Sequence, residues 1–219
     1  FVHGLTLLDA DASRNPALHG ASKVFLPYCT QDLWVGGGGT TTAAGVALTF
    51  DGHGVFARAV NRLLAPGGAR GVALGNASTV VLAGSSAGGL GASFNIGYLA
   101  EALRAHAPAA QPPRAPPFLA GVIDSAWFIN FDPLLPRRDG VADATMLELL
   151  EAGIALWKPR LEDGLVTGLA SGCPHARVPH LRTRCLLPHA VAGRVTQPLL
   201  YVNSQYDFYG GLIANADAA

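Results

Sequence analysis

Residues 84–88 read Gly-Ser-Ser-Ala-Gly and place Ser86 at the centre of a G-x-S-x-G pattern. An apolar run at 79–83 precedes this pattern and a helical stretch follows it, which is the setting of a nucleophile elbow. In an elbow, a sharp turn lifts the serine hydroxyl out of the strand end, and the glycines leave room for a strained backbone. The chain contains 27 glycines, so an ordinary turn between a strand and a helix is the alternative. The flanking elements favour Ser86 as a nucleophile.

A serine nucleophile needs a histidine to accept its proton and a carboxylate to orient that histidine. In α/β-hydrolases the acid follows the serine in the chain, and the histidine follows the acid. Asp207 comes shortly after an apolar run at 198–202 and stands where the acid belongs. Asp124, at the end of an earlier apolar run, is the alternative. We expect Asp124 to cap a turn or to organise the floor of the site.

No histidine follows Asp207. Each of the seven histidines is expected to face solvent or to lie in a turn; they are His3, His19, His53, His106, His175, His180 and His189. If the usual order holds, the base is absent from this chain, and we expect the sequence to be truncated at both ends. Such a chain on its own is expected to be nearly inactive, because the base is essential to the triad.

Apolar runs alternate with helical patterns along most of the chain. Strands are predicted at 23–27, 46–50, 79–83, 118–123 and 198–202, helices at 55–64, 87–104 and 146–157, and surface loops at 36–42 and 107–117. Because the strands are apolar throughout, we predict an α/β fold with a mainly parallel sheet and helices on both faces. Ligands bind beyond the carboxyl ends of such strands, where Ser86, Asp124 and Asp207 fall.

Composition narrows the possible partners. The chain has 219 residues, half of them apolar, with 15 basic against 15 acidic residues. This balance does not favour nucleic acid as a partner, and no apolar run reaches the roughly 20 residues of a transmembrane segment. The length suits one domain over residues 1–219. Asn76-Ala77-Ser78 is a glycosylation sequon, and the three cysteines leave an odd thiol in a secreted protein.

Six segments occur in the order of a known family: 25–34, 50–52, 83–89, 124–128, 153–157 and 203–207. With them the chain resembles the Notum and pectin acetylesterase family of serine carboxylesterases, and more closely its Notum-like branch. The resemblance implies an α/β-hydrolase fold, in this case partial, and ester hydrolysis through an acyl-enzyme. It also implies no metal or organic cofactor, a secreted or lumenal location, and an acylated glycan or acylated protein as substrate.

The resemblance assigns roles to individual residues. Ser86 would be the nucleophile, Asp207 the triad acid and the Ala87 N–H one oxyanion-hole donor. The other donors would come from a Gly-Gly-Trp-type segment that the family carries upstream of residue 23 and this sequence lacks. Phe128 would line the acyl pocket. Leu186 and Leu187 stand where the Notum-like branch has two aromatics, so the choice between acetyl and long-chain substrates stays open.

By the same resemblance, Cys29 and Cys185 match family cysteines, and Cys173 matches less closely. Their family partners lie near the termini, so all three are expected to lack partners in this chain. Two functions remain open. One is an active carboxylesterase whose terminal segments lie outside this sequence, with a protease or lipase as a weaker variant. The other is a non-catalytic hydrolase-like domain that binds acylated ligands or glycans.

Overall fold

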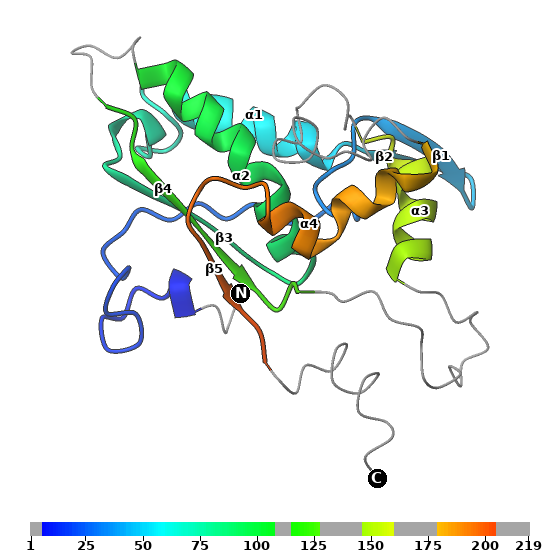
Figure 1. Ribbon diagram of the computed structural model, residues 1–219. Helices are drawn as coiled ribbons and strands as arrows, with labels where there is room; N and C mark the ends of the chain where they lie inside the picture. The colour runs from blue at the N-terminus through cyan, green and yellow to red at the C-terminus, as the bar shows by residue number, and fades with distance from the viewer. Residues whose placement is uncertain (1–5, 108–114, 128–145, 160–178, 205–219) are drawn as a thin grey trace.

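The computed structural model describes residues 6–107, 115–127, 146–159 and 179–204 (Figure 1). In chain order its elements are η1 (Thr6–Leu8), β1 (Gly39–Ala43), β2 (Val46–Phe50), α1 (Gly52–Leu64), η2 (Leu74–Asn76), β3 (Thr79–Ser85), α2 (Ala87–His106), β4 (Phe118–Asp124), α3 (Met146–Trp157), η4 (Pro179–Leu186), α4 (Pro188–Ala192) and β5 (Leu199–Val202). The predicted alternation of strands and helices is confirmed, and the observed bounds differ from the predicted ones by a few residues.

The strands β3, β4 and β5 form a parallel sheet with β4 in the middle. In its register Ser85 pairs with Asp124, and Asp124 pairs with Val202. The three strands therefore end at one edge, and the residues that follow them lie together there. The predicted parallel sheet is confirmed, and this edge is where ligands bind in such folds.

The helix α2 connects the two parts of the core. Its first half packs with β4, η4 and α4 in one apolar cluster, which includes Leu90, Phe94, Ile123, Leu186 and Val191. Its second half packs with α1 and the start of the sheet in a second cluster, which includes Phe56, Val60, Ile96, Leu99 and Leu103. Because both clusters hold α2, the helix has little freedom to shift along the sheet.

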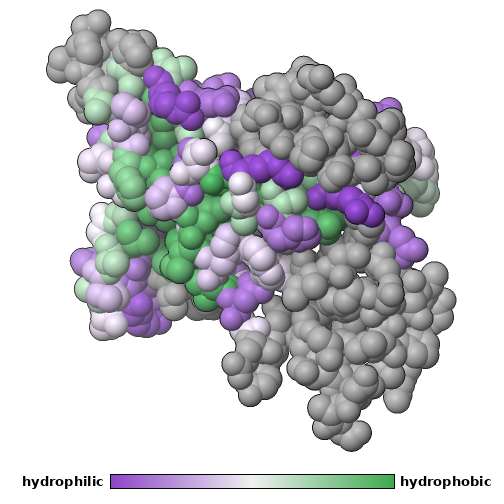
Figure 2. Space-filling model, viewed as in Figure 1, coloured by the Kyte–Doolittle hydropathy of each residue, from purple (hydrophilic) through white to green (hydrophobic). Residues whose placement is uncertain are grey.

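The two faces of the sheet differ in burial. Alternate residues of β3 and β4, such as Val80 and Leu119, are buried against the helices. Residues that point to the opposite face stay exposed in the described part of the chain; Phe118 and Leu200 are each 58% exposed. Figure 2 shows apolar surface in the region where Figure 1 draws these strands. Among the described residues, therefore, helices cover only one of the two faces expected to be covered.

Two local predictions were wrong. The predicted strand at 23–27 is not formed, and Val24 and Phe25 are exposed without a pairing strand among the described residues. The predicted loop at 36–42 contains strand β1, which forms an antiparallel hairpin with β2. Its turn residues, Ala44 and Gly45, have φ of 49° and 77°. Positive φ at both central positions is typical of a two-residue type I′ hairpin turn, and the β-branched threonines before it favour a strand.

Candidate active site

Ser86 occupies the turn between β3 and α2 with φ 53° and ψ −125°. Positive φ is uncommon for a residue with a side chain, and this ψ lies outside the left-handed helical region as well. The Ser86 N–H donates a 2.9 Å hydrogen bond to the carbonyl of Asp124, so the sheet ladder holds the strained residue in place. The side chain is exposed, and its hydroxyl has no partner among the described residues. The turn thus has the strained backbone that the sequence predicts for a nucleophile elbow, and the role of Ser86 as nucleophile stays a prediction.

Close packing explains two glycines of the turn. A methyl group on Gly84 would overlap the carbonyl oxygen of Gly88 and lie 2.8 Å from the Gly89 nitrogen. A methyl group on Gly89 would lie 2.6 Å from the Cβ of Ala126, beyond the end of β4. A methyl group on Gly88 would enter open space. The sharp turn thus depends on Gly84 and Gly89, whereas Gly88 leaves space open in the first turn of α2, next to Ser86.

The N-terminus of α2 supplies hydrogen-bond donors beside the serine. The first N–H groups of a helix lack partners within the helix and carry partial positive charge. In the described part of the chain, no acceptor is found for the Ala87 N–H, while the Leu90 N–H already donates to the Ser86 carbonyl. The Ala87 N–H is therefore placed to donate to an oxygen that becomes negative next to Ser86.

The ends of β4 and β5 form the floor beside Ser86. The Ser125 hydroxyl donates to the Asp124 carboxylate over 3.2 Å, and the Ser125 N–H donates to the Val202 carbonyl over 2.7 Å. The Trp127 N–H donates to the Asn203 side-chain oxygen over 3.4 Å. Asp124 thus holds the Ser86 turn through its carbonyl and Ser125 through its carboxylate, and its expected role in the floor of a site stays a prediction.

The remaining predicted site residues fall into two groups. Asp207 and Phe128 lie outside the described residues, although the described chain stops at Ser204 and Trp127, shortly before each. Leu186 and Leu187 are 1% and 7% exposed, at the end of η4 and the start of α4. They belong to the cluster that also contains Leu90 and Ala126. Their proposed contact with an acyl group stays a prediction.

One histidine is placed differently from the sequence prediction. His53 begins α1, as expected, but it is buried rather than in contact with solvent. Its Nδ1 lies 2.7 Å from Oδ1 of Asn95, whose amide nitrogen donates to the carbonyls of Trp34 and Gly91. Since the amide oxygen of Asn95 is the acceptor, His53 carries a proton on Nδ1. His19 and His189 are exposed as predicted.

The His53–Asn95 contact joins three segments that lie far apart in the sequence. Gly91 is in the second turn of α2, five residues after Ser86. Because it has no side chain, the Trp34 ring occupies the space where a Cβ would stand. Asn95 therefore fixes the first half of α2 against α1 and the Trp34 backbone. Sequence reasoning missed this pair, because nothing local connects residues 42 positions apart.

A buried carboxylate holds the loop before the hairpin. Asp32 has no exposed surface, and it accepts hydrogen bonds from the Thr30 hydroxyl, the Trp34 N–H and the Gly52 N–H at 2.6, 3.1 and 2.7 Å. The Gly52 N–H belongs to the first turn of α1, where negative charge is favourable. Asp32 thereby anchors the loop at 28–34 to α1, and this loop carries Trp34 onto α2.

Two tyrosines in this part of the fold have perturbed phenols. Burial raises the pKa of Tyr28, the hydrogen bond from the Leu33 N–H lowers it, and the nearby Asp32 carboxylate raises it. Burial raises the pKa of Tyr201, whose ring packs edge-on against Trp127 with centroids 4.9 Å apart. The Tyr201 hydroxyl is buried without a hydrogen-bond partner in the described structure. We find no role for it in the chemistry at Ser86.

The described segments hold no group of three or more His, Cys, Asp or Glu side chains that could bind a metal ion. None of the described helices combines the length and apolar character needed to span a bilayer.

Residues 2–214 match the family described as Pectinacetylesterase. The chain belongs to the pectinacetylesterase family. Within it, the chain is 34% identical over 157 residues to human palmitoleoyl-protein carboxylesterase NOTUM and 32% identical over 155 residues to notum1 of Xenopus laevis. These matches cover 70% and 69% of this chain but 28% of each relative. The chain thus spans a minor part of the length of these pectinacetylesterase relatives.

Solved structures support the same fold. The Drosophila protein described as the Wnt deacylase Notum superimposes in two crystal forms with TM-scores of 0.72 and 0.68. The alignments cover 97% of this chain and 55% and 54% of the Drosophila chains, at 24% identity. This member of the pectinacetylesterase family therefore has the α/β fold with a parallel sheet and helices seen in the Notum structures.

One described cysteine agrees with the expectation based on the family and one differs from it. Cys29 is exposed and its thiol is free. Cys185 is fully buried and disulfide-bonded, with a partner outside the described residues. The prediction that all three cysteines lack a partner in this chain was therefore wrong for Cys185.

Proposed function

We propose that this protein is a serine carboxylesterase that hydrolyses O-acyl esters through an acyl-enzyme formed on Ser86. The observation that carries the proposal is the backbone of Ser86, which is strained, exposed and placed at the N-terminus of α2. Strained residues of this kind are held by the surrounding structure and cluster at active sites. The names of the relatives, palmitoleoyl-protein carboxylesterases, support an acylated substrate.

In this mechanism the Ser86 Oγ attacks the ester carbonyl carbon while a histidine accepts its proton. The carbonyl oxygen becomes negative and receives a hydrogen bond from the Ala87 N–H, an interaction worth roughly 3 kcal/mol in the transition state. The alcohol leaves with the histidine's proton, and water then hydrolyses the acyl-enzyme. Asp207 orients the histidine. By triad order this histidine follows Asp207, and the seven histidines of the sequence precede it.

We further propose that the substrate is an acylated protein or an acylated glycan in a secretory or extracellular compartment. The bonded Cys185 supports an oxidising environment. Leu186 and Leu187, together with Phe128, would give the acyl group an apolar wall. Acetyl and long-chain esters are both compatible with this wall. A series of chromogenic esters with short to long acyl chains, with a peptide substrate beside it, measures the preference, and a preference for the peptide would overturn the esterase assignment.

Labelling with a fluorophosphonate tests the nucleophile, because only an activated serine reacts with it. The natural protein in its full length should be labelled at Ser86, and Ser86→Ala should abolish the label. Ser85→Ala is the matched control, since Ser85 is the other serine of the pentapeptide and lies in β3 rather than in the turn. We expect Ser85→Ala to retain labelling. A folded natural protein that does not react would refute the esterase and favour a non-catalytic domain that binds acylated ligands.

A further inference from the structure

The sequon Asn76-Ala77-Ser78 lies at the end of the sheet opposite to the candidate active site. Asn76 is the last residue of η2, and Ser78 directly precedes β3. Ser86 follows the other end of β3, seven residues long, so the two ends are about 20 Å apart at about 3.3 Å per residue. A large group attached to Asn76 would therefore leave the approach to Ser86 open.

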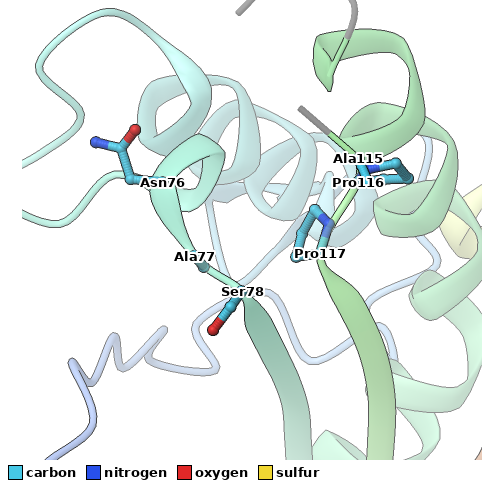
Figure 3. Close-up of a pocket in the computed structure, with 6 residues that line it drawn as sticks. All are labelled: Asn76, Ala77, Ser78, Ala115, Pro116 and Pro117. Carbon is cyan, nitrogen blue, oxygen red and sulfur yellow. The ribbon is translucent and has the colours of Figure 1, made fainter. Parts of the chain in front are cut away.

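Both side chains that define the sequon are accessible. Asn76 and Ser78 are exposed, and neither side chain has a hydrogen-bond partner among the described residues. Figure 3 shows the Asn76 amide directed away from Ala115, Pro116 and Pro117, the residues on the other side of a shallow pocket. A substituent on the amide nitrogen therefore extends away from Ala115, Pro116 and Pro117 and does not displace them.

The backbone presents the sequon in a defined way. Ala77 has φ −70° and ψ 144°, so the chain leaves the η2 turn in an extended conformation. The Ser78 carbonyl then accepts a 3.0 Å hydrogen bond from the Phe118 N–H, which fixes the end of the sequon to the sheet. The Asn76 N–H donates to the Ala73 carbonyl, so backbone bonds hold the segment while the side chains stay accessible.

We propose that Asn76 is an N-glycosylation site, an inference that rests on the secreted or lumenal location proposed above. The donor is a lipid-diphosphate-linked oligosaccharide. The Asn76 Nδ2 attacks the anomeric carbon of its first sugar, a C–N bond forms, and the bond from this carbon to the diphosphate oxygen breaks. The lipid diphosphate leaves with the electron pair, and the amide loses one proton. The glycan is bulky and hydrophilic, so it suits an exposed position away from the active site.

The experiment is to produce the natural protein in full length in eukaryotic cells, isolate it from the medium and digest it with peptide-N-glycosidase. We expect a glycan at residue 76, whose mass is lost on digestion while Asn76 becomes aspartate. Asn76→Gln and Ser78→Ala should each remove this glycan, whereas Ser78→Thr should keep it. Asn61→Gln is the matched control, because Asn61 is exposed on α1 outside any sequon, and it should keep the glycan.

A secreted protein with unmodified Asn76 would overturn the proposal, as would a natural protein that stays in the cytosol. Fluorophosphonate labelling of the same samples separates this inference from the proposed function. Labelled protein without a glycan refutes the modification alone, and glycosylated protein without label refutes the esterase alone. Asn76→Gln should react with the probe at the wild-type rate, since the sequon lies at the far end of β3.

Discussion

The packing of the elbow predicts a graded response to alanine at three neighbouring glycines. Gly84→Ala puts a methyl group into the Gly88 carbonyl oxygen and 2.8 Å from the Gly89 nitrogen, both of them backbone atoms. Ordinary contacts of about 3.5 Å would be regained only if the first turn of α2 moved by more than about 1 Å. Both core clusters resist this movement, because they hold the two halves of α2.

The expected size of the effect follows from that displacement. Overpacking of this kind lowers the free energy of unfolding by about 1–3 kcal/mol, and we place Gly84→Ala at the upper end because no side chain can yield. Gly89→Ala meets the Ala126 Cβ at 2.6 Å and the carbonyl oxygens of Asp124 and Gly84 at 3.0 Å, which are longer contacts than those of Gly84→Ala, and should lose about 1–2 kcal/mol. Gly88→Ala meets open space and replaces glycine in a helix, so it should be neutral or gain up to about 1 kcal/mol.

Two assays measure the series on the full-length protein: urea unfolding for stability and the rate of fluorophosphonate labelling for the geometry of Ser86. A misplacement of about 1 Å reduces a catalytic rate by about a hundredfold, which is the loss expected for labelling of Gly84→Ala. Equal unfolding free energies for Gly84→Ala and Gly88→Ala would show that close packing does not shape the elbow. Labelling of Gly84→Ala at the wild-type rate would likewise show that close packing at Gly84 does not set the geometry of Ser86.

Three further substitutions test the residues around the elbow. Asn95→Ala removes the acceptor for His53 Nδ1 and the donor to the Trp34 carbonyl in the core. We therefore expect the free energy of unfolding, measured in urea, to fall by about 2–4 kcal/mol. An unchanged free energy of unfolding would refute the anchoring of α2 by the His53–Asn95 pair. Asp32→Asn replaces one accepting oxygen with a donor that faces an N–H group. It should lower the free energy of unfolding by about 2–3 kcal/mol and slow the labelling of Ser86. A melting temperature unchanged from wild type would contradict the expected loss of stability. Tyr201→Phe removes a buried hydroxyl without a partner among the described residues and should raise the free energy of unfolding by about 1 kcal/mol at neutral pH. Because burial raises the pKa of Tyr201, the folded protein favours the neutral phenol. The stability of the wild-type protein should therefore decline as the pH rises above about 10. Tyr201→Phe should reduce this decline.

Several features of the fold follow from local sequence alone. The apolar runs that became β3, β4 and β5 are continuous, which indicates strands buried in a parallel sheet, and helical spacing located α1, α2 and α3 to within a few residues. The G-x-S-x-G pattern between strand and helix located Ser86. These predictions succeed because they depend on the periodicity of one segment, and each segment carries that information in its own residues.

The failures concern pairing partners. Segment 23–27 has a strand-like pattern but no strand beside it in the described structure. Segment 36–42 has a glycine-rich start, yet its second half pairs with β2. A strand is stabilised by hydrogen bonds to another strand, so local propensity decides neither case. His53 likewise begins a helix as predicted, and only the packing of α1 on α2 brings it to Asn95.

By itself, the sequence determined the alternation of β3, β4 and β5 with α2 and α3, the position of the candidate nucleophile and the family resemblance that the comparisons bear out. Only the tertiary structure decided which glycines the elbow needs, how Asn95 and Asp32 anchor α2 and its surroundings, and that Asn76 projects into solvent at the end of the sheet far from Ser86. The reason is physical. Patterns along the chain report which face of an element is buried, whereas a contact between distant residues depends on how whole elements pack.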